Sequence, residues 1–201
     1  MSTFFYNRQL TNMKSKTPLQ TLLVIHLSAL AAISGTVAAQ DILNLKTGTI
    51  TFFSSAPVED IKAVNTTFTS AINLVDSSVV FSVPVAGFVF RKKLMQEHFN
   101  DQYMESSRFP TARFQGNLTR LPQPGPGSVP LQARVKGMLT IRDISRKIDE
   151  TVTFTPDGNG IASVCEFMVR LADYDIKIPR ILIKNIAEEV RVTVNVVYSS
   201  R

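Results

Sequence analysis

The side chains best suited to chemistry in this sequence are few. His98 stands among the carboxylates Glu97 and Asp101, a set that could provide a general base or part of a metal site. A zinc site needs three or four ligands, and the only other histidine, His26, lies far away near the amino terminus. We therefore interpret His98 as a half-buried imidazole that hydrogen-bonds a neighbouring group, and we expect no metal site.

Other catalytic arrangements are equally weak. The spacing of Glu97, Asp101 and Glu105 places three carboxylates on one helical face, which is more typical of a solvated face than of paired acids. The sequence contains no G-x-S-x-G motif and no phosphate-binding glycine loop. Cys165, the only cysteine, lies in the middle of an alternating apolar run and is expected to be a small core residue. We predict a binding protein that is not an enzyme and has no cofactor.

The elements that would position a binding site are strands. Apolar and polar residues alternate with the period of two that is typical of strands with one apolar face. Proline-rich or glycine-containing turns separate these runs, as in PDGNG at 156–160. Eight strands are predicted, at 49–53, 64–74, 78–88, 112–119, 129–142, 148–154, 161–171 and 190–196. Eight antiparallel strands can close into a small barrel, but a two-sheet sandwich would give the same alternation.

One segment between two predicted strands has a different pattern. Leu94, Met95, Phe99 and Tyr103 recur at the three- and four-residue spacing of an amphipathic helix. Phe109-Pro110 then returns the chain to extended geometry. A helix inserted between strands must cover an apolar surface, so we predict that it caps one end of a hydrophobic interior.

Three stretches resemble the YceI-like family. They are LMQEHFNDQYMES (94–106), RFPTARFQG (108–116) and VKGMLTIRDISRKI (135–148), and the similarity extends over roughly 49–198. The resemblance implies an all-β, eight-stranded, antiparallel, lipocalin-like barrel that holds a polyisoprenoid or quinone-type lipid in the periplasm. The sequence departs from the family at 173–175, where a more glycine-like turn is expected, and in the proline-rich loop at 121–130.

The inward face of such a barrel would form the binding site. We predict that eight residues form its wall and that three residues of the helical segment close its top. The wall residues are Phe81, Phe114, Leu118, Val135, Leu139, Phe154, Phe167 and Val169, and the closing residues are Met95, Phe99 and Tyr103. Each of these residues could equally be ordinary core.

Two other arrangements are compatible with the same pattern. An eight-stranded barrel can be filled by its own side chains. It would then act as a structural or protein-interaction module, through a basic outer face of Arg134, Lys136 and Arg142. A barrel with its apolar face outward would instead lie in an outer membrane, but the helical insertion and the absence of tryptophan disfavour it.

The first 39 residues are predicted to be a secretory signal peptide. Arg8, Lys14 and Lys16 precede an apolar run at 19–33, and Val37-Ala38-Ala39 offers a cleavage site before Gln40. The run is short for a membrane span, which needs about 20 residues. Cleavage would remove three basic and no acidic residues and so lower the formal net charge from +6 to +3.

Residues 40–201 would then form one lipid-binding domain that is periplasmic or secreted and not embedded in the membrane. A charge of this size gives no indication of nucleic-acid binding.

Overall fold

The computed structural model describes residues 41–55, 60–125, 127–177 and 187–199. The predicted signal peptide lies outside the described residues. No helix in the described ranges is long and apolar enough to cross a membrane.

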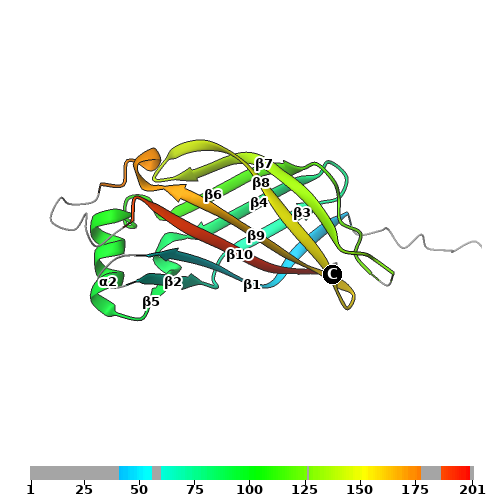
Figure 1. Ribbon diagram of the computed structural model, residues 1–201, viewed down its shortest axis with the longest axis horizontal. Coiled ribbons are helices and arrows are strands. Elements are labelled where there is room, and N and C mark those ends of the chain that lie inside the picture. Colours follow the sequence, from blue (N-terminus) through cyan, green and yellow to red (C-terminus); the bar gives the residue numbers. More distant parts are fainter. Residues whose placement is uncertain (1–40, 56–59, 126, 178–186, 200–201) are drawn as a thin grey trace, which may run out of the picture. The chain divides into compact units, whose positions relative to one another are not determined.

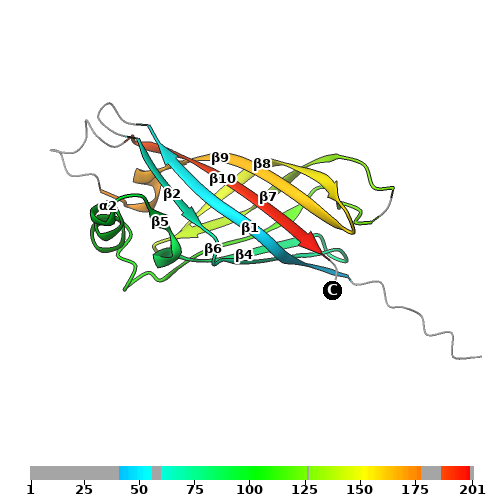
Figure 2. The same ribbon diagram turned by 90° about the horizontal axis from the view of Figure 1, so that it is seen from below.

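Eight antiparallel strands close into a barrel, as predicted. Their order around the barrel is β10-β9-β8-β7-β6-β4-β3-β1, and β1 pairs with β10 to close the sheet (Figures 1 and 2). The strands are β1 (Ile42–Ser54), β3 (Thr69–Asn73), β4 (Ser78–Pro84), β6 (Thr111–Leu118), β7 (Leu131–Ile141), β8 (Ile144–Asp157), β9 (Gly160–Arg170) and β10 (Glu189–Ser199).

The prediction of a single strand at 64–74 was wrong, because the chain turns a corner between β2 (Ile61–Asn65) and β3 (Thr69–Asn73) within this segment. β2 ends at Asn65, whose Oδ1 accepts hydrogen bonds from the backbone N–H and the hydroxyl of Thr67 at 2.8 and 3.0 Å. Its Nδ2 donates to the Pro84 carbonyl at 2.8 Å. An asparagine side chain that bonds the backbone two residues later makes a turn at a position where apolar alternation alone gives no sign of one.

The corner gives one end of the barrel an additional pair of strands. The start of β1 pairs with β3, whereas its end pairs with β2, and β2 in turn pairs with β5 (Val89–Phe90). The strand predicted at 78–88 ends at Pro84 and continues as a 3₁₀ turn, η1 (Val85–Gly87). β2 and β5 therefore extend the wall at the end of the barrel where the helix lies.

The predicted helical segment is α2 (Lys93–His98), which continues as a π-helical turn, η2 (Phe99–Tyr103). In both views α2 lies beside β5 at one end of the barrel (Figures 1 and 2). Met95, Phe99 and Tyr103 face the interior, but Leu94 is 60% exposed. Its assignment to the apolar stripe was wrong, because the inward stripe follows the four-residue spacing from Met95 and Leu94 lies about 100° away from it. We call α2 and η2 together the cap.

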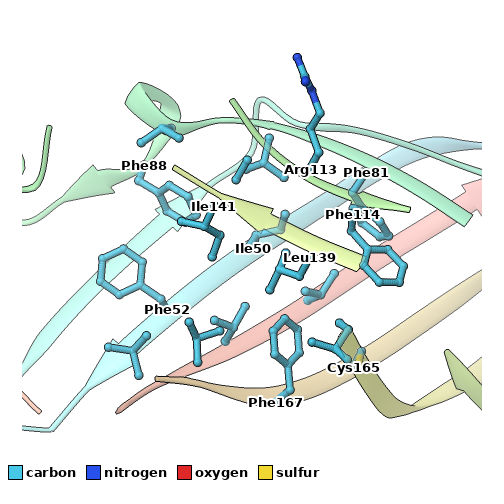
Figure 3. Close-up of a pocket in the computed structure, with 18 of the residues that line it drawn as sticks. Ile50, Phe52, Phe81, Phe88, Arg113, Phe114, Leu139, Ile141, Cys165 and Phe167 are labelled. Carbon is cyan, nitrogen blue, oxygen red and sulfur yellow. The ribbon is translucent and has the colours of Figure 1, made fainter. Parts of the chain in front are cut away.

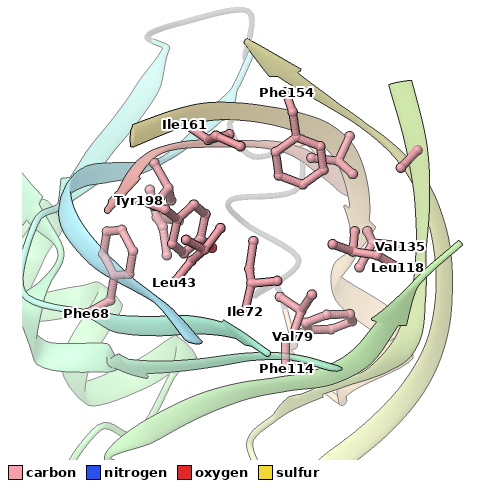
Figure 4. Packing of buried hydrophobic residues seen from close by; sticks show 14 of the residues in the cluster. Leu43, Phe68, Ile72, Val79, Phe114, Leu118, Val135, Phe154, Ile161 and Tyr198 are labelled. Carbon is pink, nitrogen blue, oxygen red and sulfur yellow. The ribbon is translucent and has the colours of Figure 1, made fainter. Parts of the chain in front are cut away.

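Apolar side chains face the interior and polar side chains face outward. Along β7, Ala133 and Val135 are buried while Arg134 and Lys136 are exposed. The end of the barrel away from the cap is packed with buried side chains that include Leu43, Ile72, Phe154, Ile161 and Tyr198 (Figure 4). We call this the closed end; there the Tyr198 hydroxyl and Ser70 Oγ form a hydrogen bond of 2.7 Å.

Candidate binding cavity

A cavity of about 440 Å³ occupies the barrel interior between the closed end and the cap. Every one of the eight barrel strands contributes to its wall, and the cap contributes Met95, His98, Phe99 and Tyr103. All eleven residues predicted to form the site line it. Contact between these eleven residues and a ligand remains a prediction. A cavity of this size lies within the range of about 300–1,000 Å³ that is usual for small-molecule sites.

Strand register aligns the wall residues. Phe81 on β4 is directly opposite Phe114 on β6, and Phe114 is directly opposite Leu139 on β7. The rings of Phe81 and Phe114 meet edge to face with centroids 6.4 Å apart. On the other side of the cavity, Phe167 and Cys165 of β9 extend inward (Figure 3). The wall is therefore a band of apolar side chains held in place by ladder hydrogen bonds.

Two glycines leave space within this band. Gly116 and Gly137 are cross-strand partners on the inner face of β6 and β7. A Cβ added to Gly137 would lie 2.3 Å from the Gln115 carbonyl oxygen and 2.8 Å from the Phe114 ring. The absence of side chains here lets the Phe114 ring lie along the wall.

Phe99 is the centre of an aromatic cluster beneath the cap. Its ring centroid lies 5.4 Å from that of Phe52, 5.7 Å from that of Phe88 and 5.0 Å from that of Phe90. Aromatic rings at these separations stabilise the structure by more than the burial of their apolar surface alone. Sequence analysis missed Phe52, Phe88 and Phe90 as site residues, although each lies in or next to a run that it identified as a strand.

The connection after β9 also contributes to the wall. Leu171 of η3 (Leu171–Tyr174) and Ile176 line the cavity near the cap. Tyr174 and Ile176 pack with Val85, Met104 and Val169 in a second core cluster. Leu171 ends the alternating run predicted at 161–171 but was not named as a site residue, and Ile176 was missed because the sequence around it has no regular period.

Arg142 joins three segments at the cap end. It donates from Nη2 to Glu105 Oε1 just beyond the cap and from Nη1 to the Asp175 carbonyl after η3. Glu105, Arg142 and Asp175 all have positive φ, at 46°, 49° and 52°. Only 12% of the Arg142 side chain is exposed, and its guanidinium lies 5.4 Å from the centroid of the Phe109 ring.

The prediction of a basic outer face was therefore wrong for Arg142. Its position in the tight turn between β7 and β8 directs the side chain over the end of the barrel. Arg134 and Lys136 do lie outside, where both form ion pairs with Asp149, at 2.6 and 3.2 Å.

Polar groups are sparse on the cavity wall, and most have partners within the protein. Ser163 Oγ donates to the Val196 carbonyl at 3.4 Å, and Ser54 Oγ accepts from the Ala187 N–H at 3.2 Å. Arg113 contributes to the wall but extends its guanidinium away from the cavity (Figure 3). Burial raises the pKa of the Cys165 thiol to about 11, and the nearby Glu150 carboxylate adds to the effect.

Two of the three carboxylates on the predicted helical face pair with other residues. Glu97 lies 3.6 Å from Lys93, and Glu105 pairs with Arg142. Within the described ranges, no group of three or more histidine, cysteine, aspartate or glutamate side chains is placed to hold a metal ion. The chemistry that this arrangement supports is the burial of an apolar molecule.

Comparison with known proteins gives both a family and a fold. The family model of the YceI-like domain matches residues 33–198. A polyisoprenoid binding domain from Saccharophagus degradans has a TM-score of 0.67 at 12% identity, over 81% of this chain and all of that one. Burkholderia cenocepacia BcnA has a TM-score of 0.63 at 14% identity, over 75% of this chain and 95% of that one.

A Campylobacter jejuni YCEI protein gives a TM-score of 0.51 at 13% identity, over 94% of this chain and 99% of that one. No curated protein matches the sequence. At such identities the structural likeness shows the fold, and the family model shows the relationship. The chain belongs to the YceI-like family.

Proposed function

We propose that this protein binds a long apolar or amphiphilic lipid, of polyisoprenoid or quinone type, inside its barrel and holds it without changing it chemically. The observation that carries the proposal is the cavity of about 440 Å³ with its almost entirely apolar wall. The family and the polyisoprenoid binding domain among the similar structures support this class of ligand.

The energetics of burial favour a chain-like ligand. Each buried CH₂ group contributes about 0.8 kcal/mol, so a five-carbon isoprene unit contributes about 4 kcal/mol. Association costs on the order of 4–15 kcal/mol in lost freedom of motion. Two or three buried units therefore offset this cost without any precisely placed polar contact, and a smooth apolar wall is sufficient.

The side chains of the wall support binding rather than catalysis. With a pKa of about 11, the Cys165 thiol stays protonated near neutral pH and is a poor nucleophile. Glu97, the neighbour of His98 in the sequence, pairs with Lys93, and Glu105 pairs with Arg142. This arrangement lacks the paired base and nucleophile that acyl or phosphoryl transfer requires.

The predicted signal peptide supports a periplasmic or secreted location. We expect the exported protein to begin at Gln40, and intact-mass measurement of protein from the periplasmic fraction checks this. A mature chain that retains residues 1–39 would contradict the prediction.

Lipid extraction tests the proposed function directly. We expect mass spectrometry of an organic extract of the purified protein to detect an isoprenoid lipid, and the delipidated protein to take up added polyprenol. Leu139→Trp fills part of the cavity and should reduce uptake, whereas Met138→Trp changes the adjacent outward residue on β7 and should not. A protein that carries no lipid and takes up no polyprenol would refute the proposal.

The alternative of a filled barrel receives no support from the described residues. Side chains fill the closed end, but the cavity occupies the interior beneath the cap. The basic residues assigned to an interaction surface are engaged in ion pairs, with Asp149 on the outside and with Glu105 beneath the cap.

A further inference from the structure

One end of the cavity is blocked by packed side chains. Ile72, Phe154 and Tyr198 line the cavity and also belong to the buried cluster of the closed end. Leu43 and Ile161 belong to the same cluster but do not line the cavity, and they are 0% and 2% exposed (Figure 4). The cavity therefore ends at the first three residues, which we call the floor.

Contacts with neighbouring strands hold the floor in place. Phe154 on β8 is directly opposite Leu131 of β7 and Ser163 of β9. The Tyr198 hydroxyl on β10 is hydrogen-bonded to Ser70 Oγ of β3 at 2.7 Å. Close-packed interiors yield little to added volume, because a group forced into them distorts side chains and backbone. A lipid tail that reaches the floor therefore stops there.

The floor suits the apolar end of a lipid better than its head group. The Tyr198 hydroxyl pairs with Ser70, and Ser163 Oγ donates to the Val196 carbonyl at 3.4 Å. A head group placed at this end would lose its hydrogen bonds with water, and such a loss is unfavourable in an apolar environment. The end of the tail therefore faces the floor, and the head group lies toward the cap.

The volume between the floor and the cap limits how much of a tail can be enclosed. The cavity measures about 440 Å³. A CH₂ group occupies about as much space as a water molecule, whose share of liquid volume is about 30 Å³. The cavity therefore encloses about 15 carbon atoms, or three isoprene units. Further units of a longer tail must stay outside it.

We propose that the floor makes this protein selective for the length of the lipid tail. Each carbon atom that the cavity encloses raises affinity about fourfold, whereas a carbon atom outside the cavity adds little. Affinity therefore rises with tail length until the tail fills the space between the floor and the cap, and then levels off. This inference rests on the proposed function and narrows its ligand class by tail length.

A series of prenols that differ only in tail length tests the inference. Geraniol, farnesol, geranylgeraniol and geranylfarnesol contain two, three, four and five isoprene units. Affinity for the delipidated protein is measured by displacement of the fluorescent probe N-phenylnaphthylamine. We expect farnesol to bind the wild-type protein at least about 100-fold more tightly than geraniol. Geranylgeraniol and geranylfarnesol should bind within about threefold of farnesol, because their additional units are not enclosed.

Variants of the floor should move this limit. Phe154→Ala removes six ring carbons, close to one isoprene unit, so geranylgeraniol should bind this variant at least about tenfold more tightly than farnesol. Ile72→Ala should raise the same affinity ratio by a smaller factor, and it tests the inference if Phe154→Ala does not fold. Ile161→Ala is the matched control, because it removes the same carbons from a residue behind the floor and should leave the ratio unchanged.

The outcomes separate this inference from the proposed function. If affinity for the wild-type protein continues to rise steeply from farnesol to geranylfarnesol, the tail-length limit is overturned while lipid binding stands. The assignment to the floor is likewise overturned if neither Phe154→Ala nor Ile72→Ala shifts the limit, or if Ile161→Ala shifts it as far as Ile72→Ala does. If no prenol binds the wild-type protein, both proposals are overturned.

Discussion

Cys165 can report directly on occupancy of the cavity. It is the only cysteine in the chain, it lies on β9, and its side chain lines the cavity between Val152 of β8 and Val194 of β10. We predict that its reaction with Ellman's reagent is slow in the empty protein, accelerates steadily with pH, and nearly stops when lipid fills the cavity.

The expected rates follow from the pKa of the thiol. A thiol with the ordinary pKa of 9.0 is about one-tenth ionised at pH 8, whereas Cys165, with a pKa of about 11, is about one-thousandth ionised. The more basic thiolate is intrinsically more nucleophilic, which raises its reaction rate roughly eightfold and offsets part of this loss. The net expectation is a reaction about tenfold slower than that of an ordinary thiol, with a rate that continues to rise above pH 9.

Ligand should slow the reaction further by mass action. At a free concentration of about 100 times Kd, about 1% of the protein is empty, so the rate should fall about 100-fold. Polyprenol and the apolar probe N-phenylnaphthylamine should both protect the thiol, because protection requires only that the cavity be occupied.

The double substitution Val164→Cys with Cys165→Ser moves the thiol to the adjacent outward position, which is 47% exposed. This control should react at an ordinary rate whether or not ligand is present. A plateau in the rate of the wild-type protein near pH 9, or equal protection of the outward thiol, would refute the placement of Cys165 on a ligand-filled cavity.

Three other predictions concern the wall, the cap and the effect of pH on stability. Gly137→Ala should lower the free energy of unfolding by about 1–3 kcal/mol in urea denaturation, because its Cβ would overlap the backbone of β6. Arg142→Gln should accelerate lipid dissociation about tenfold in stopped-flow measurements, because it removes a charge-assisted hydrogen bond worth about 1.5 kcal/mol that holds the cap. Stability should fall as pH rises above about 9, because burial raises the folded-state pKa values of Cys165 and Tyr198, so the folded state retains protons that the unfolded chain has released. Above pH 10 the contribution of Tyr198 alone should approach about 1.4 kcal/mol per pH unit.

Each of these predictions has a matched control. Gly158→Asn should change the free energy of unfolding little, since an added Cβ there meets no neighbour and asparagine tolerates the positive φ of that turn. Arg134→Gln removes an ion pair on the outer face and should leave the dissociation rate unchanged. Tyr198→Phe should flatten the loss of stability above pH 10, and an unchanged slope would contradict the assignment of that loss to the buried phenol.

Local pattern predicted the wall because barrel geometry obeys a local rule. Alternate residues of a strand face the same side, so the apolar set that contains Val135 and Leu139 had to lie together on one face of β7. The four-residue spacing from Met95 through Phe99 to Tyr103 likewise placed these side chains on one face of the cap. Both predictions needed only the period of the backbone.

The corner at Asn65 and the position of Arg142 needed contacts between distant parts of the chain. Asn65 ends β2 by bonding both to Thr67 and to the Pro84 carbonyl, which is 19 residues away. Arg142 lies beneath the cap because Glu105 and Asp175 meet it there. In each case the partner is remote in sequence, so neither residue type nor local period could predict it.

The alternation in the sequence determined that the chain would form strands with one apolar face, because it acts within each strand, and the resemblance to the YceI-like family implied that these strands form an antiparallel barrel. Only the tertiary structure decided that the face would enclose a cavity rather than a filled core. Free volume depends on how side chains from opposite walls meet: large side chains fill the closed end around Leu43 and Tyr198, whereas the side chains beneath the cap leave a cavity of about 440 Å³. That balance is a property of the whole closed sheet and is not encoded in any single strand.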